Sequence, residues 1–399
     1  MDAPNRATAV APVGVSLGRI FGIRVRLHPS VLVIVALILV SLAQGAFRHW
    51  HPDWPWWTAW STAFVATVLF LASLLTHELA HSLVARRRGI AVPQITLFVF
   101  GGVAEIAAEP TDPRSEFVIA IVGPLTSVAI AVVFAFVGAW LVPPDFTDRV
   151  AADPAATMAQ LTPFATICVW LAPVNLVLAL FNLVPGFPLD GGRVLRAVLW
   201  WWTGDQVKAT RLAAGCGRAF SWLLIAWGVL DFFGGRGLEG LWLIIIGVFL
   251  GNAAASGYQQ LLVRRSLNGL VVADLMRTHF ETVEPTRSLA DFVDRLLLRS
   301  AQTSWPVVED GRTIGVIAQR DVAKTAEADR SRLLVRDVMR PLAQVTVLAP
   351  SLAGPAALER IAEMADEPLP VVERDEIVGL LHASDIFRWL SLHRLHATP

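Results

Sequence analysis

Long apolar runs, separated by short polar segments, fill the first two thirds of the chain. Each run carries few charged residues and is long enough to cross about 30 Å of hydrocarbon as a helix. The expected spans cover residues 30–47, 57–85, 116–141, 162–184, 219–233 and 239–257. The fifth is the shortest, because residues 204–218 before it indicate a polar-faced helix or loop. The pattern predicts an α-helical polytopic membrane domain with about six transmembrane helices.

The hydrophobic pattern changes between the second and third spans. Residues 92–106 form two β-prone runs joined by Gly101 and Gly102, which predicts a membrane-associated β-hairpin. A free strand edge on such a hairpin can hold an unwound peptide in extended form by strand addition. Gly101 and Gly102 are therefore candidate substrate-contacting residues. The alternative is a hairpin that only packs against the domain and caps it.

A different pattern begins near residue 264, where charged residues become more frequent and the sequence repeats. Asp274-Leu275-Met276 recurs as Asp337-Val338-Met339, and Pro306-Val307-Val308 recurs as Pro370-Val371-Val372. Each copy predicts helix, short strand, helix, strand, turn, strand and helix, so the pair forms a soluble α/β domain. The expected organisation is a cytoplasmic segment 1–29, a transmembrane domain 30–263 and a cytoplasmic pair 264–392, with halves 264–327 and 328–392.

Composition agrees with a chain that is largely surrounded by lipid. Hydrophobic residues make up 55% and charged residues 17%, below the roughly 25% charged residues of ordinary soluble proteins. The chain has 33 residues of each charge sign, which gives no indication of nucleic-acid binding. Cys168 and Cys216 provide neither a disulfide framework nor a cysteine zinc site. Residues 1–27 lack an apolar core, so no cleavable signal peptide is expected before the first span.

Positive charge gathers on one side of the expected spans. Arginines and lysines precede the first span, follow the second, separate the fourth from the fifth and follow the sixth. The opposite side offers Arg48, Arg149 and Arg236. This asymmetry predicts that both the N- and C-termini lie in the cytoplasm. The expected location of this multi-pass protein is the plasma membrane.

The second span contains the sequence His77-Glu78-Leu79-Ala80-His81. On a helix, His77 and His81 lie one turn apart on one face, which suits two nitrogen ligands to one zinc ion. Glu78 can act as general base on a metal-bound water. Such groups are unfavourable within a bilayer, so we prefer a functional interpretation to a chance match in a core helix.

A second polar segment follows the fourth span at the same expected depth. Pro185 and Pro188 interrupt the helix, and Gly191-Gly192 is expected to allow a tight backbone turn there. Asp190 at this break is the candidate third ligand, the alternative being an aspartate in an ordinary loop.

Two asparagines share one face of the fourth span. Asn182 is a candidate donor to a developing oxyanion or to an extended substrate, with a helix–helix contact as an equal alternative. Asn175 is expected to tie neighbouring helices together.

These two motifs together resemble the site-2 family of intramembrane zinc metalloproteases. The resemblance covers about residues 15–257 and rests on His77-Glu78-x-x-His81 and on Asn182-x-x-Pro185-x-x-x-x-Asp190-Gly191. It implies that His77, His81 and Asp190 hold one Zn²⁺ and that Glu78 activates water. The implied substrate is a transmembrane protein segment, such as an anti-sigma factor or a signal-peptide remnant.

The C-terminal repeat resembles a tandem pair of CBS modules. Such pairs often bind adenine nucleotides, with a Ser or Thr on phosphate and an aspartate three residues later on ribose. The aspartates are present as Asp321 and Asp385, whereas Ala318 and His382 stand at the hydroxyl positions. The resemblance therefore implies a possible nucleotide site, and a gating or homodimerisation module is the favoured alternative.

Three other functions are compatible with parts of the pattern. CBS pairs also occur on ion channels and transporters, but a transporter should show paired broken helices, and a single broken segment is found here. An inactive membrane scaffold would not need the complete set of zinc-site residues. A metal-dependent hydrolase of lipids or small substrates would not need the strand-presenting hairpin.

Overall fold

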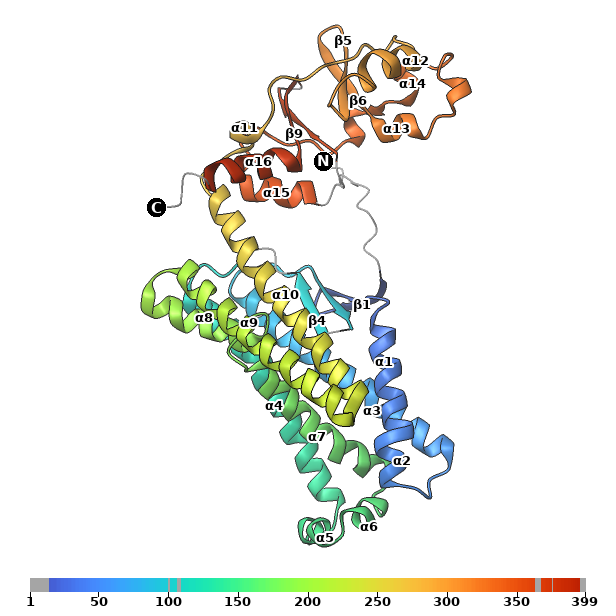
Figure 1. The fold of residues 1–399 in the computed structure, drawn as a ribbon, viewed down its shortest axis with the longest axis vertical. Helices are drawn as coiled ribbons and strands as arrows, with labels where there is room; N and C mark the ends of the chain where they lie inside the picture. The colour runs from blue at the N-terminus through green and yellow to red at the C-terminus, as the bar shows by residue number, and fades with distance from the viewer. Residues whose placement is uncertain (1–13, 100, 106–108, 363–366, 375, 395–399) are drawn as a thin grey trace. The chain divides into compact units, whose positions relative to one another are not determined.

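The computed structural model describes residues 14–99, 101–105, 109–362, 367–374 and 376–394 and consists of two compact units (Figure 1). The first unit extends to Gln259, and the second begins at Gln260. A single long helix, α10 (Gly237–Leu267), carries the chain from one to the other. Each unit is described by itself below.

The first unit is built mainly from helices with the length and apolar character needed to cross a membrane. The six candidate spans are Val31–Trp50, Trp56–Arg87, Pro113–Leu141, Pro163–Asn182, Gln206–Gly235 and Glu239–Leu267. They contain α1 (Val31–Val40), a π-helical turn η1 (Ser41–Ala46), α2 (Phe47–Trp50), α3 (Trp56–Arg87), α4 (Pro113–Leu141), α7 (Pro163–Asn182), α9 (Gln206–Asp231), a second π-helical turn η2 (Phe232–Arg236) and α10. The predicted polytopic helical fold is confirmed.

The fifth span is longer than the sequence pattern indicated. The carboxylate of Asp205 accepts hydrogen bonds from the backbone N–H groups of Val207 and Lys208, and α9 begins directly after it. Small buried side chains such as Ala209 and Ala213 then let this polar-looking segment pack closely as a helix. Residues 206–218 are therefore part of the same helix as the expected span.

The start of α4 is fixed by a capping aspartate. Asp112 accepts a hydrogen bond from the backbone N–H of Ser115 at 2.9 Å, and Pro113 occupies the first helical position. Hydrogen bonds from the side chain and backbone of Ser115 lower the pKa of the Asp112 carboxyl. The cap thus sets where α4 enters the helical bundle.

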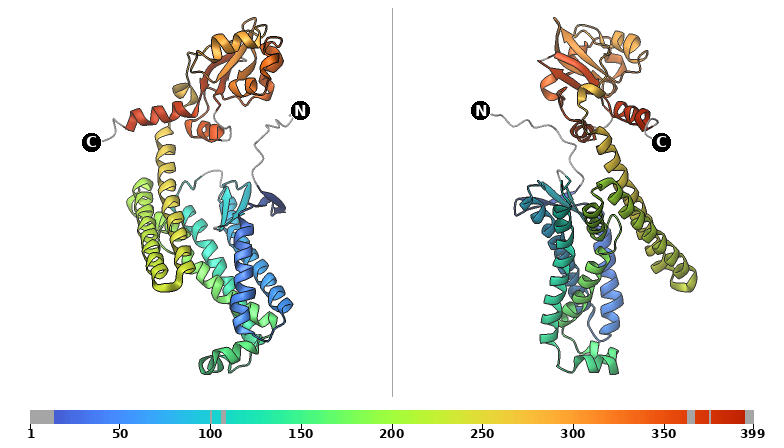
Figure 2. Two further views of the ribbon diagram at one scale, coloured as in Figure 1. Left: turned by 45° about the vertical axis from the view of Figure 1, so that its right-hand side comes forward. Right: turned by 90° about the vertical axis from the view of Figure 1, so that its left-hand side faces the viewer.

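A four-stranded sheet lies at one end of this bundle, and α5 (Phe146–Ala152) and α6 (Pro154–Ala159) lie at the other (Figures 1 and 2). Its strands are β1 (Val15–Ile20), β2 (Ile23–Leu27), β3 (Gln94–Phe98) and β4 (Gly101–Glu105), in the order β1-β2-β3-β4. The predicted hairpin is present as the antiparallel pair β3 and β4. The first two strands were not predicted, because their short alternation lies in a segment without other strand signals. Strand β2 joins β3 in parallel.

The sheet packs directly on α3, which carries the His-Glu-x-x-His sequence, and on α4. Ile23 and Ile95 are fully buried together with Leu79 of α3 and Ile119 of α4. This contact covers one side of α3 at the level of the His-Glu-x-x-His sequence. Strand β4 is an edge strand of the sheet, and α4 is the next helix in the sequence.

The second unit contains the repeated α/β halves. Its elements are α11 (Val272–Leu275), α12 (Leu289–Phe292), η3 (Val293–Leu297), β5 (Ser304–Glu309), β6 (Arg312–Ala318), α13 (Gln319–Ala323), η4 (Glu327–Asp329), α14 (Val335–Val338), β7 (Arg340–Pro341), η5 (Leu342–Gln344), α15 (Gly354–Ala362), β8 (Leu369–Glu373), β9 (Glu376–Leu381) and α16 (Ala383–Arg394). Val272 of α11 is buried in a core with β8, β9, α15 and α16, whereas Val335 of α14 is buried with β5 and β6. Each half therefore contributes its first helix to the core of the other.

Candidate metal centre

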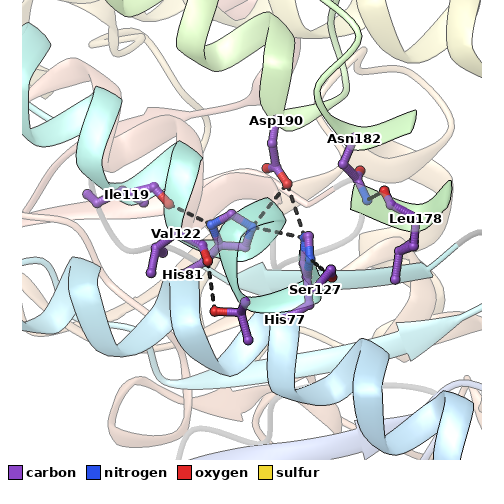
Figure 3. A network of polar contacts seen from close by, with 9 residues as sticks. His77, His81, Ile119, Val122, Ser127, Leu178, Asn182 and Asp190 are labelled. Atoms are coloured by element: carbon purple, nitrogen blue, oxygen red, sulfur yellow. Dashed lines mark hydrogen bonds and ion pairs between the residues drawn. The ribbon is translucent and has the colours of Figure 1, made fainter. Parts of the chain in front are cut away.

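Three side chains from two helices converge on one point in the first unit. His77 and His81 lie on α3, and Asp190 is the first residue of α8 (Asp190–Thr203). The Nε2 atoms of the imidazoles are 3.2 Å apart, and each lies 3.1 Å from Oδ2 of Asp190 (Figure 3). Both histidines are buried. Within the described part of the chain, these three form the one group of His, Cys, Asp and Glu side chains with metal-site spacing.

Residues of α4 bind the Nδ1 atoms of both imidazoles, on the opposite side of each ring from Asp190. Nδ1 of His77 lies 2.9 Å from the hydroxyl of Ser127, and Nδ1 of His81 donates to the backbone carbonyl of Ile119 at 2.6 Å. A proton on Nδ1 of His81 leaves the Nε2 lone pair free for a metal. The partners on α4 thus fix the orientation of both rings.

The space beside the two Nε2 atoms is open because the neighbouring residue of α4 is a glycine. A Cβ added to Gly123 of α4 would lie 2.1 Å from Nε2 of His81 and 2.7 Å from Nε2 of His77. Two imidazoles and one carboxylate form a ligand set of catalytic zinc sites, in which a further position stays open for water or substrate. The donors and the space at Gly123 fit a zinc ion.

Close backbone packing places Asp190 opposite the histidines. A Cβ on Gly191 would lie 2.3 Å from the carbonyl oxygen of Leu183, and one on Gly192 would lie 2.3 Å from the carbonyl carbon of Gly186. A Cβ on Gly217 of α9 would meet the carbonyl oxygen of Phe187 at 2.1 Å. The segment between α7 and α8 is therefore folded so closely against α8 and α9 that a side chain does not fit at these three glycine positions.

The prediction that Gly191-Gly192 allows a tight backbone turn is wrong. Both residues lie in the first turn of α8, and neither has a positive φ. They are required for the close approach of two backbone segments and not for a tight turn. The interruption after α7, which ends at Asn182, lies where Pro185 and Pro188 predicted it.

Glu78 and the hairpin lie against each other beside the three donors. A Cβ on Gly102 of β4 would be 2.4 Å from Cγ of Glu78, so the edge strand contacts this side chain. Gly101 has a φ of 135°, and a Cβ there would meet no atom within 4 Å. The structure thus brings Glu78, Gly102 and the histidine pair into one region.

The two asparagines make hydrogen bonds within their own helix. Nδ2 of Asn182 donates to the carbonyl of Leu178 at 3.0 Å, and Figure 3 shows it beside the donors but turned toward that carbonyl. Nδ2 of Asn175 donates to the carbonyl of Leu171 at 2.9 Å. The sequence predicted that Asn175 would contact a neighbouring helix, whereas its amide group donates within α7.

Sequence reasoning missed the supporting residues on α4. Ile119, Gly123 and Ser127 are spaced four residues apart, so they form one stripe along α4 that faces the histidines. A glycine and a serine on one stripe of an apolar span indicate a close helix contact. This signal was present in the sequence and could have identified the face.

Comparisons with known proteins identify the family to which the chain belongs. The sequence model of Peptidase family M50 matches residues 65–224, and the CBS domain model matches residues 272–327 and 335–392. Rip3 of Mycobacterium tuberculosis strain H37Rv, named as a zinc metalloprotease, is 37% identical over 386 residues, which cover 96% of this chain and 94% of Rip3. The chain belongs to peptidase family M50.

Two further relatives are similar over different shares of the chain. The protein sll0528 of Synechocystis, also named as a zinc metalloprotease, is 31% identical and covers 94% of this chain and 95% of its own length. A solved structure of the site-2 protease from Methanocaldococcus jannaschii is 27% identical, with a TM-score of 0.42, and covers 61% of this chain and 94% of its own. The family match, the two relatives named as zinc metalloproteases, the CBS match and the six candidate spans together make this M50 protein a multi-pass membrane zinc metalloprotease with a C-terminal CBS pair.

In the CBS pair, the two candidate ribose residues already have partners. Oδ2 of Asp321 accepts hydrogen bonds from the backbone N–H of Ala318 at 3.1 Å and from Nε of Arg340 at 3.0 Å. Asp385 accepts from the backbone N–H of His382 and from Nε of Arg277, at 3.1 and 2.6 Å. Each aspartate therefore caps its own helix and pairs with an arginine from the other half.

Proposed function

We propose that this M50 protein is an intramembrane endopeptidase that cleaves transmembrane segments of other membrane proteins. His77, His81 and Asp190 would hold one zinc ion, and Glu78 would be the general base. The observation that carries this proposal is the convergence of two oriented imidazoles and one carboxylate on one point between candidate membrane spans. Zinc bound there would supply Lewis acidity to the reacting carbonyl and acidify water.

The protein's own side chains would transfer the proton and position the imidazole rings. Glu78 would accept the proton of the attacking water and return it to the leaving amine nitrogen, so the cleaved bond and the transferred proton balance. Ser127 and the carbonyl of Ile119 would keep the two imidazole rings fixed during this step. Asn182, whose amide lies beside the donors, is the candidate partner of the developing oxyanion.

Strand β4 would present the substrate to Glu78. A peptide bond within a helix is shielded by the helix's own hydrogen bonds, so it must be unwound before cleavage. The edge of β4 can pair with an extended segment, and Gly102 lies against the Glu78 side chain. A segment added to this edge would therefore lie next to the general base, with Gly101 and Gly102 leaving room for its backbone.

The setting of the reaction follows from the distribution of positive charge. Arginines at the ends of the spans favour a cytoplasmic location for both termini, and we place the protein in the plasma membrane. The substrates would be membrane proteins that expose a cleavable transmembrane segment near the cytoplasmic face. Anti-sigma factors and signal-peptide remnants are examples of this class.

The CBS pair, which we assign to residues 264–392, would modulate the protease assigned to residues 30–263. The last turns of α10 belong to the second unit, where Leu267 is buried in the core and Arg264 pairs with Glu359 of α15. A change in the pair would therefore act on a helix that also contains the last candidate span. Dimerisation or gating is the favoured mode, and Asp321 and Asp385 remain the candidate contacts for an adenine nucleotide.

The first experiment is elemental analysis of the full-length protein purified in detergent. We expect about one zinc per chain in the parent and its loss in His81→Ala and Asp190→Ala, because each removes a ligand. His49→Ala, an exposed histidine on α2, is the matched control and should retain zinc. A parent that neither contains nor takes up zinc would contradict the proposed centre.

The second measurement separates zinc binding from catalysis. Glu78→Gln should keep zinc and lower the cleavage of a transmembrane reporter by about 100-fold or more, because the amide cannot accept the proton. Cleavage at the parental rate by Glu78→Gln would exclude Glu78 as the base while leaving the zinc site intact.

A further inference from the structure

A buried ion pair links α8, which carries Asp190, to α4, which contacts the two histidines. Glu116 on α4 is fully buried, and Nε of Arg196 on α8 donates to its Oε1 at 2.5 Å. The Nη2 atom of Arg196 contacts the same oxygen, so the guanidinium engages Glu116 through two nitrogens. The Arg196 side chain is 8% exposed, which means that both charges are removed from solvent and depend on each other.

The arginine also contacts the segment that leads into α8. Its guanidinium carbon lies 5.1 Å from the centre of the Phe187 ring, within the range of a cation–π contact. Phe187 precedes Asp190 by three residues. Arg196 thus joins α4, α8 and the segment between α7 and α8 at one place.

Each partner of the pair is close in its helix to a residue of the proposed zinc site. Glu116 lies one turn before Ile119, whose carbonyl accepts the hydrogen bond from His81. Arg196 lies on the helix that begins with Asp190. A displacement of α8 along α4 would therefore move the carboxylate relative to the two imidazoles.

We propose that Glu116 and Arg196 are positioning residues that fix the location of Asp190 relative to His77 and His81. This inference rests on the proposed zinc centre. Two nitrogens of the guanidinium contact one carboxylate oxygen, which gives the ion pair a preferred direction, so it sets the register of α8 on α4 more narrowly than an apolar contact of the same size. Among the described residues, no hydrogen bond or ion pair joins Glu116 or Arg196 to the three donors, so both residues act through the helices that carry them.

The chain provides a matched control at the same helix interface. Arg114 of α4 lies 5.2 Å from the ring centre of Trp201 on α8, and both side chains are exposed. This second contact joins the same two helices, but it is farther along α8 from Asp190. Arg114→Gln therefore removes an α4–α8 contact without removing the buried charge pair.

The test measures zinc affinity by chelator competition on full-length protein in detergent. Glu116→Gln should weaken zinc binding by about 10- to 100-fold, the range found when groups that orient metal ligands are replaced. Arg196→Lys keeps the charge but loses the fork and should give an intermediate loss. Arg114→Gln should bind zinc as the parent does.

The absorption spectrum of the Co²⁺-substituted protein gives a second readout that a merely structural role would not change. We expect Glu116→Gln and Arg196→Lys to shift the d–d bands, because the ligand geometry changes, and Arg114→Gln to leave them unchanged. Parental affinity and spectrum in both variants, with His81→Ala still devoid of zinc, would overturn the positioning role and leave the zinc centre standing. If Glu116→Gln does not fold, Arg196→Lys decides by the same criteria.

Discussion

At the residue scale, the candidate metal centre depends on glycines, which leave space around it, as much as on the three candidate ligands. Gly123 lies in front of both Nε2 atoms, Gly102 lies against Glu78, and Gly191 lies against the carbonyl of Leu183. None of these three glycines needs a positive φ, so their role is space and not backbone conformation. Replacing any one with alanine introduces a single methyl group at a defined place.

Gly123→Ala tests the space in front of the donors. The new Cβ would lie 2.1 Å from Nε2 of His81, so either the ring or α4 must move. We expect zinc binding to fall by at least about tenfold in chelator competition. The control is Gly215→Ala in α9, where a Cβ meets no atom within 4 Å, and it should bind zinc normally. Equal zinc affinity in Gly123→Ala and the parent would show that the metal lies elsewhere.

Residue types and spacing predicted part of the site, and tertiary contacts account for the rest. His77, Glu78 and His81 are recognisable because a helix places positions four apart on one face, and Asp190 is recognisable beside two prolines that interrupt a span. The sequence alone indicated no role for Glu116, the first residue of the expected third span. Its burial becomes visible only when α8 and Arg196 are packed against it.

At the element scale, the long periodic segments were predictable and the short ones were not. Six spans follow from hydrophobic length alone, and Gly101-Gly102 between β-prone runs indicated the hairpin. Strands β1 and β2 were missed because they are only six and five residues long and because β2 is held in the sheet by pairing with β3, which lies about 70 residues later in the sequence. The exchange of α11 and α14 between the CBS halves could not be read from the repeat, since both arrangements have the same sequence period.

The aspartates of the CBS repeat have a structural role that can be measured. Asp321 caps α13 and pairs with Arg340, so Asp321→Ala removes a cap and leaves a half-buried guanidinium with one fewer partner. We expect local destabilisation of about 2 kcal/mol. Hydrogen–deuterium exchange of the full-length protein should show faster exchange in peptides from β6 and α13.

Asp294→Ala is the control for Asp321→Ala, because the Asp294 side chain is exposed. It should leave the exchange of β6 and α13 unchanged. Unchanged exchange in Asp321→Ala as well would mean that the carboxylate is dispensable for the fold, which would favour a ligand-binding role for it.

At the scale of the whole molecule, the direction of insertion determines which substrates can reach the centre. The sheet lies at the end of the bundle opposite to α5 and α6 (Figures 1 and 2). With the arginine-rich ends in the cytoplasm, β4 and the metal centre would open toward the cytoplasmic half of the bilayer. The protease would then cleave near that face and release cytoplasmic fragments.

Cysteine labelling of the full-length protein in spheroplasts tests this orientation, with Cys168 and Cys216 replaced by serine. A cysteine at Asp148, exposed on α5, should react with a membrane-impermeant maleimide in intact spheroplasts. A cysteine at Glu327, exposed in the CBS pair, should react only after lysis. The reverse pattern would place the CBS pair outside the cell and would require the β4 edge to receive substrates from the outer half of the bilayer. Because the labelling needs no zinc and no cleavage, it decides the orientation independently of the proposed chemistry.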